Sequence, residues 1–161
     1  MRKAETSCGA CASGGRQHIL ASAGDAIVAA DREGIIRVWN AGAERIFGYG
    51  PEEAVGVSLD LIIPEHLRAA HWAGWRAVVS TGRSRYGGGD LLSVPGIRKD
   101  GRRISVEFTI VPLKDEGAQL VGMAAVMRDV SKRFEELKAL RRELAEATDK
   151  ARAAGAASRP G

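Results

Sequence analysis

Two short glycine-containing turns beside apolar runs constrain the fold of this chain more than any other feature. The turn Asp31-Arg32-Glu33-Gly34 separates the runs Ala26–Ala30 and Ile35–Asn40. The turn Lys99-Asp100-Gly101-Arg102 precedes the long run Arg103–Leu113. A tight turn with glycine between apolar runs is typical of a β-hairpin, because glycine accepts backbone conformations that other residues avoid. The sequence therefore predicts a β-hairpin at each turn.

Strict alternation marks the strand that follows the second turn. Its apolar residues fall on one face, with polar residues between them, as expected of a half-buried strand: Ile104, Val106, Phe108 and Ile110. A last strand is expected over 119–127. Leu91, Leu92 and Val94 indicate a further strand, which we expect Pro95-Gly96 to interrupt. The sequence thus predicts an α+β fold, with five antiparallel strands and short helices on one face.

The segment between the second and third strands reads as helical. Asn40 is a good cap for a helix over 41–47, Pro51 opens a single turn, and Pro64 opens a helix that ends near Thr81-Gly82. In the last of these, one face carries the residues at i, i+4, i+8 and i+11, which are Leu67, His71, Trp75 and Val78. His71 therefore shares an apolar face, whereas His66 lies about 140° away around the helix and is expected to face solvent.

After Asp129 the pattern changes to a heptad-like helix. The positions with spacings of seven, three, four, three and four are Val130, Leu137, Leu140, Leu144, Ala147 and Ala151, with Arg133 in the one seam position that is not apolar. Such a seam predicts a helix that dimerises. The alternative is a helix that folds back on its own sheet. The expected organisation is a disordered tail over 1–15, a domain over 16–131, an amphipathic signalling or dimerisation helix over 132–154 and a frayed end over 155–161.

Charge and hydropathy exclude several classes of function. The formal net charge of the 161 residues is +4. Counting Asp, Glu, Lys and Arg, residues 19–127 carry −1, so the excess lies in the two ends rather than on a folded face that could bind nucleic acid. No apolar run approaches the roughly 20 residues that span a bilayer. The first residues contain no apolar signal segment, and we expect a cytoplasmic protein without a membrane partner.

The two cysteines and the polar residues give no indication of catalysis. Cys8 and Cys11 form a single C-x-x-C in the N-terminal tail, without the second ligand pair that a zinc site needs. Neither a Ser/His/Asp or Cys/His set, nor a phosphate-binding loop, nor a pair of carboxylates with catalytic spacing is present. We therefore expect a protein that is not an enzyme.

Several segments, taken in order, resemble the PAS sensor domain over residues 18–131. No single segment is specific to this family, but the order in which they occur is. The segments are Asp25–Asp31, Ile35–Asn40, Ala43–Tyr49, Pro51–Gly56, Arg98–Gly101 and Met127–Ser131. Because this fold serves many functions, the function has to be argued from the site.

The segment Ile63–His71 is similar to the haem helix of oxygen-sensing PAS domains in rhizobial kinases and bacterial phosphodiesterases. In that family the helix opens with a proline, and the iron-binding histidine follows seven residues later, which is the spacing of Pro64 and His71. The resemblance implies haem b (iron protoporphyrin IX) as cofactor and His71 as its metal ligand, with Leu67 and Trp75 beside it. A neutral imidazole in apolar surroundings suits five-coordinate haem iron.

The resemblance also assigns roles outside this helix. Phe108 and Ile110 lie on the strand that lines the gas side of the haem, and both alternate inward here. Core packing would place them in the same way. Cations near the haem propionates would come from Arg76, Arg83 or Arg85, of which Arg85 is the best candidate.

The chain departs from the oxygen sensors at one position. Those sensors carry an arginine, ahead of the second hairpin turn, that donates a hydrogen bond to bound oxygen. Counting back from Asp100 this place falls on Leu92, and counting forward from His71 it falls on Leu91. Neither side chain can donate a hydrogen bond, so oxygen should be held less well, whereas CO and NO depend less on such a donor.

The resemblance implies a sensor of a diatomic gas (O2, CO or NO) or of redox state. It would signal through the C-terminal helix to a downstream signalling protein, as a homodimer. The alternative is a cofactor-free PAS module for dimerisation or protein interaction. A third hypothesis is a flavin-binding PAS domain. The reactive cysteine of the light-sensing type has no counterpart here, because both cysteines lie in the N-terminal tail.

Overall fold

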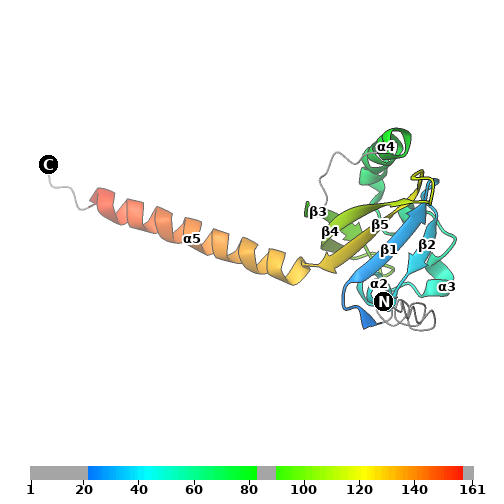
Figure 1. Ribbon diagram of the computed structural model, residues 1–161. Helices are drawn as coiled ribbons and strands as arrows, with labels where there is room; N and C mark the ends of the chain where they lie inside the picture. Colours follow the sequence, from blue (N-terminus) through cyan, green and yellow to red (C-terminus); the bar gives the residue numbers. More distant parts are fainter. Residues whose placement is uncertain (1–21, 83–89, 158–161) are drawn as a thin grey trace, which may run out of the picture. The chain divides into compact units, whose positions relative to one another are not determined.

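The computed structural model of the protein describes residues 22–82 and 90–157 and divides the chain into two compact units, 1–129 and 130–161. The first unit contains one five-stranded antiparallel sheet in the order β2-β1-β5-β4-β3 (Figure 1). The strands are β1 (Ala26–Asp31), β2 (Ile36–Trp39), β3 (Leu92–Ile97), β4 (Arg103–Lys114) and β5 (Leu120–Asp129). This architecture confirms the expected α+β class.

The β1–β2 turn is stabilised by its own first residue. The Asp31 carboxylate accepts hydrogen bonds from the backbone N–H groups of Glu33 (3.1 Å) and Ile35 (2.9 Å), and from the Arg37 guanidinium (2.7 Å). Gly34 adopts a left-handed conformation, with a φ of 80°. These bonds keep the turn short and set the register of β1 against β2.

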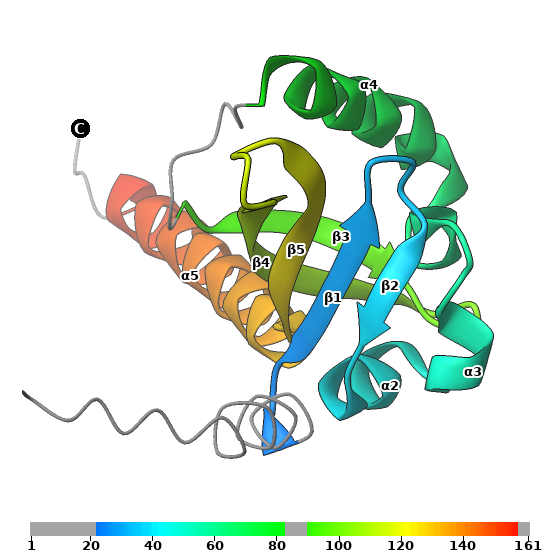
Figure 2. The same ribbon diagram turned by 45° about the vertical axis from the view of Figure 1, so that its right-hand side comes forward.

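Three helices and one 3-10 turn follow the first hairpin. In chain order they are the helices α2 (Ala41–Phe47) and α3 (Pro51–Ala54), the 3-10 turn η1 (Leu59–Leu61) and the helix α4 (Glu65–Thr81). Asn40 caps α2, because its Oδ1 accepts the N–H of Ala43 (2.9 Å). Pro64 precedes α4, and Gly82 ends it in the left-handed conformation. Figure 2 shows α4 passing beside the β1–β2 turn.

The helical segment covers one face of the sheet and encloses the core there. Val28 and Ile36 from the strands meet Phe47 and Leu59 from the helical segment, and all four are buried. Along β4, Ile104 and Val106 are buried, whereas Phe108 and Ile110 on the same face remain half-buried. Burial along the inner face of β4 is therefore complete near its start and only partial at Phe108 and Ile110.

The expectation that Pro95-Gly96 interrupts its strand is wrong. Strand β3 runs through both residues, with Pro95 paired opposite Ser105 and Gly96 opposite Ile104. Proline lacks the N–H that a central strand needs, but β3 is an edge strand, where that donor is not required on the open side. Gly96 is needed for packing, since a Cβ there would lie 3.2 Å from Val106 and 3.4 Å from Phe47.

The second unit contains helix α5 (Ser131–Ala157). Within the described part of the chain, no helix is both long enough and apolar enough to cross a membrane. The expected tail over 1–15, with Cys8 and Cys11, lies outside the described residues, and so does the last part of the expected frayed end.

Candidate functional site

The face of α4 predicted from its periodicity is the half-buried face. Leu67, His71, Trp75 and Val78 are all partly buried, and no residue of this helix is fully buried. His66 is exposed, as expected, and its Nδ1 lies 3.4 Å from the guanidinium of Arg103. Helix α4 therefore presents His71, rather than His66, on the side that carries its apolar residues.

His71 packs within a cluster of three rings. Its imidazole meets Trp72 edge-on, with 4.8 Å between ring centroids and 77° between planes, and lies 5.7 Å from Trp75 at a tilt of 37°. The two indoles meet edge to face at 5.9 Å. Both tryptophans also pack against the core. Since the three rings come from positions i, i+1 and i+4 of one helix, the local sequence creates the cluster.

Each indole N–H of this cluster is bound outside α4. Trp72 Nε1 donates to Oδ1 of Asp60 in η1 (2.8 Å), and Trp75 Nε1 donates to the carbonyl of Arg32 in the β1–β2 turn (2.9 Å). Arg68 in turn donates to the carbonyl of Asp60 (3.0 Å). These bonds fix α4 to two separate segments of the fold.

The imidazole of His71 has a nitrogen without a partner. Nδ1 is buried and finds no hydrogen-bond acceptor or donor among the described residues. Burial lowers the pKa of His71 below its ordinary value, because the charged ring is poorly solvated there, while the negative charge of Asp60 opposes this shift. A neutral imidazole in apolar surroundings has a lone pair available for a metal ion.

The sheet residues of the candidate site lie on its inner face. Phe108 and Ile110 share the face of buried Val106, and Leu92 pairs directly opposite Phe108. Leu92 is half-buried, whereas Leu91 lies before β3 and is 62% exposed. Of the two leucines that counting from Asp100 and from His71 allowed, Leu92 has the better place for lining a site on this face.

The structure describes only Arg76 among the three cations expected near haem propionates. Arg76 is exposed on α4, and Arg83 and Arg85 lie outside the described residues. Across residues 22–82 and 90–157, no three His, Cys, Asp or Glu side chains gather closely enough to hold a metal ion. A metal at His71 would therefore have to bring its other ligands with it, as iron does within a porphyrin.

Sequence reasoning missed three residues of this site. Trp72 shares the half-buried face with His71, but the i, i+4 series that singled out Trp75 passed over it. Asp60 gives no signal in the sequence, yet it accepts the Trp72 N–H. Gly34 was interpreted only as a turn glycine, yet a Cβ there would overlap the Trp72 ring. The available signal was the presence of two tryptophans within one helix turn.

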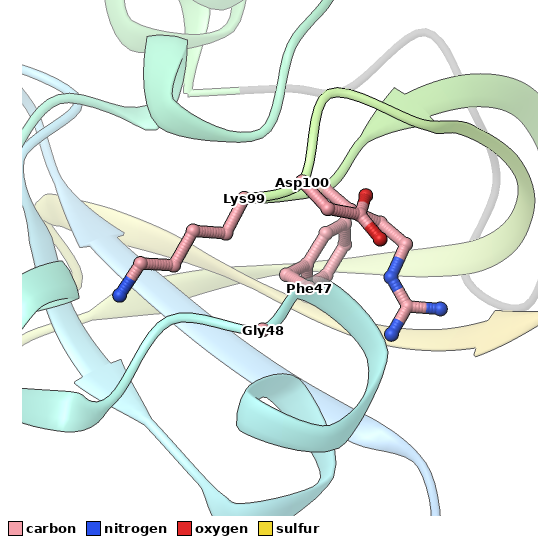
Figure 3. A pocket seen from close by; sticks show the side chains of 5 residues that line it. Phe47, Gly48, Lys99 and Asp100 are labelled. Carbon is pink, nitrogen blue, oxygen red and sulfur yellow. The ribbon is translucent and has the colours of Figure 1, made fainter.

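A separate hollow of about 250 Å³ lies between the end of α2 and the β3–β4 turn (Figure 3). It is lined by Phe47, Gly48, Arg98, Lys99 and Asp100. The charged groups at its rim already have partners, since Lys99 binds Glu53, Asp100 binds Arg102 and the Arg98 guanidinium donates to a backbone carbonyl. The charged side chains that line this hollow are therefore already bonded within the fold.

Comparisons with known proteins agree with this architecture. An uncharacterised protein of Azorhizobium caulinodans is 32% identical over 128 residues, which are 79% of this chain and 17% of that protein. The oxygen sensor protein DosP of Escherichia coli is 32% identical over 96 residues, which are 60% of this chain and 12% of that protein. The chain thus spans less than a fifth of the length of either relative.

A solved structure and a family model extend the likeness to the fold. The PAS domain of a protein from Colwellia psychrerythraea superimposes with a TM-score of 0.65 at 26% identity, covering 75% of this chain and 98% of that one. A family model described as the PAS fold matches residues 20–135. With the sheet order, the intervening helices and this match in agreement, the chain belongs to the PAS family.

Proposed function

We propose that this PAS domain binds haem b, with His71 as the axial ligand of the iron, and that it senses a diatomic gas or a redox state. The observation that carries the proposal is the His71 imidazole on the half-buried face of α4, which packs against two tryptophans and whose buried Nδ1 has no hydrogen-bond partner among the described residues. Burial also lowers its pKa, which favours the neutral ring. A relative named as an oxygen sensor supports the same class of function.

The residues around His71 fit the chemistry of a porphyrin. Leu67 and Trp75 would contact it beside the axial ligand, and Phe108, Ile110 and Leu92 would supply apolar surface from the sheet. Arg85 is proposed as the partner of a propionate. When bound, haem iron supplies an open coordination position for a diatomic gas and a redox couple.

The sheet side of the proposed site favours gases that need no hydrogen-bond donor. Leu92, like its neighbour Leu91, presents only apolar atoms, so bound oxygen would lack the stabilisation that a cationic donor gives. We expect CO and NO to be retained better than O2. The protein is proposed to act in the cytoplasm as a sensory module rather than as an enzyme.

The test is a titration of the full chain with hemin, followed by absorbance and by tryptophan fluorescence. A Soret band that saturates near one equivalent and shifts with dithionite and CO is expected, together with quenching of Trp72 and Trp75, whose rings lie within 6 Å of His71. His71→Ala should abolish the band. His66→Ala is the matched control on the same helix and should retain it, because His66 is exposed. A wild-type protein that ignores hemin would refute the proposal.

A second proposal concerns the output. Helix α5 exposes Phe134, Leu137, Leu140 and Leu144 in the single chain, and Leu144 is 69% exposed. We propose that these residues pair with a second copy and that the resulting dimer signals to a downstream protein. The cofactor-free interaction module makes the same use of α5, so a colourless dimer would favour it.

A further inference from the structure

Trp72 is fixed at both ends of its indole. At the pyrrole end, Nε1 donates to Oδ1 of Asp60 at 2.8 Å. At the benzene end, the ring lies so close to Gly34 that a Cβ there would overlap Cη2. A ring that is held from both ends has little freedom to rotate, so its plane is set by η1 and by the β1–β2 turn.

The acceptor of this bond is itself held in place. The carbonyl of Asp60 accepts from Arg68 (3.0 Å), and the Arg68 guanidinium also donates to the carbonyl of Ile63 (3.2 Å). The N–H of Asp60 donates to Oγ of Ser58 (3.2 Å). The carboxylate therefore projects from a short turn whose backbone is bonded on both sides, which makes it a rigid partner for the indole.

His71 has no comparable bond of its own. A histidine that binds a metal is normally oriented by a hydrogen bond from its second nitrogen to a carboxylate, a carbonyl or water. No hydrogen bond to either ring nitrogen of His71 is found among the described residues, so whichever nitrogen binds a metal, the other has no such partner there. The direction of the imidazole then depends on ring packing, and its nearest ring is Trp72, edge-on at 4.8 Å.

We propose that Trp72, fixed by Asp60 and Gly34, is a positioning residue that sets the plane of the His71 imidazole, the ring that would bind the iron. This inference rests on the proposed function. It assigns to aromatic packing the role that a hydrogen bond to the histidine has in most metal sites. Asp60 acts on the metal ligand through Trp72, and Arg68 acts through Asp60.

The experiment compares three variants of the full chain loaded with hemin. Asp60→Ala removes the acceptor, Trp72→Phe removes the donor but keeps an aromatic ring, and Asp60→Asn keeps an amide oxygen in the place of Oδ1. The readout is the iron–histidine stretching band of the reduced protein in resonance Raman spectra, because it reports the strength and orientation of that bond. Asp60→Ala and Trp72→Phe should shift or broaden the band and weaken hemin binding about tenfold. Asp60→Asn should retain the wild-type band.

A double variant, Asp60→Ala with Trp72→Phe, tests whether the two residues act through the bond that they share or independently of each other. If Asp60 acts through Trp72, Asp60→Ala in the Trp72→Phe background adds no further shift. Additive shifts would overturn the proposal, and so would a wild-type band in both single variants. Asn40→Ala is the control for a loss of stability alone, because Asn40 lies outside the ring cluster. This variant should keep the wild-type position of the iron–histidine band.

A measurement without hemin keeps this inference distinguishable from the proposed function. In the NMR spectrum of the apoprotein, the imidazole protons of His71 are shifted by the ring current of Trp72 at 4.8 Å. Asp60→Ala should change those shifts and Asp60→Asn should preserve them. Unchanged shifts in Asp60→Ala would overturn the positioning role even if hemin binds. Failure of the wild-type protein to bind hemin would refute the proposed function instead.

Discussion

Gly34 shows how one residue can serve both a turn and a site. Its φ of 80° is in the left-handed region, and its missing side chain leaves room for the ring of Trp72. The same position therefore sets the β1–β2 turn and limits where a helix far along the chain can lie. A turn glycine without a neighbour would do only the first.

Replacing Gly34 by alanine should cost more stability than the turn alone explains. Gly101 is the matched control, because it has the same φ of 80° and nothing within 4 Å of its virtual Cβ. Gly101→Ala should lower the free energy of unfolding by about 1–2 kcal/mol through backbone strain. Gly34→Ala should lose roughly another 1–3 kcal/mol through overlap with Trp72. Equal losses in urea denaturation would contradict the close packing.

The lowered pKa of His71 has a consequence for stability. Because burial disfavours the charged imidazole, its folded pKa lies below that of the unfolded chain, about 6.5. The contribution of neutral His71 to the free energy of unfolding is fully present above the pKa of the unfolded chain. This contribution is lost as the pH falls from that value through the pKa of the folded state. The lowered carboxylate pKa values of Asp25 and Asp31 act at more acidic pH.

Acidification from pH 7 to pH 5 should therefore destabilise the apoprotein through His71. The free energy of unfolding, measured in urea at several pH values, should fall over this window in the wild type and fall less in His71→Gln. His66→Gln is the control on the same helix and should keep the wild-type slope. A slope that survives in His71→Gln would assign the effect to another group.

At the scale of elements, Asn40 joins the end of β2 to the start of α2 and to β1. Its Oδ1 accepts from the N–H of Ala43 (2.9 Å) and of Ile27 (2.8 Å), and its Nδ2 donates to the carbonyl of Asp25 (3.0 Å). The side chain is only 6% exposed. It therefore caps a helix and completes the hydrogen bonding of a neighbouring strand.

Asn40→Ala should be more costly than the loss of an ordinary helix cap. A cap alone is worth about 0.5–2 kcal/mol, and the part-buried N–H of Ile27, left without an acceptor, adds about 1 kcal/mol. Ser58→Ala is a suitable comparison, because Ser58 caps η1 through a single 3.2 Å bond to Asp60. In thermal and urea unfolding, Asn40→Ala should be clearly less stable than Ser58→Ala. Equal losses of stability would argue against a contribution from the bond between Asn40 and the N–H of Ile27 in β1.

Local sequence signals predicted those elements whose cause is local. Asn40 marks the start of a helix through its side chain, whereas Pro64 and Gly82 mark helix ends through their backbones, and the periodicity of α4 identified the face that carries His71. The course of β3 through Pro95 was missed, because only the sheet order makes that strand an edge. Asp60 and Trp72 were also missed, since their contact joins residues 12 positions apart whose spacing has no simple pattern.

At the scale of the whole molecule, the chain combines a PAS domain with a helix that has an exposed apolar stripe. Leu140 and Leu144 are 60% and 69% exposed, which is unusual for leucines on a long helix. Charged residues occupy most of the remaining surface of α5, with the i,i+4 ion pairs Lys132–Glu136 and Arg142–Glu146. This pattern predicts an interface along one stripe, rather than burial on all sides.

The oligomeric state is therefore the property on which a single leucine should have a large effect. We expect light scattering to give twice the 17.1 kDa chain mass for the wild type, and a monomer for Leu140→Asp, because a carboxylate in the seam would be desolvated on pairing. Ala139→Asp introduces the same charge one residue away, off the seam, and should leave the dimer intact. A Leu140→Asp protein that remains dimeric, while hemin binding at His71 is unchanged, would place the interface in the PAS domain. In that case the stripe on α5 would be available to a different protein, and its leucines would bind that protein rather than a second copy of the chain.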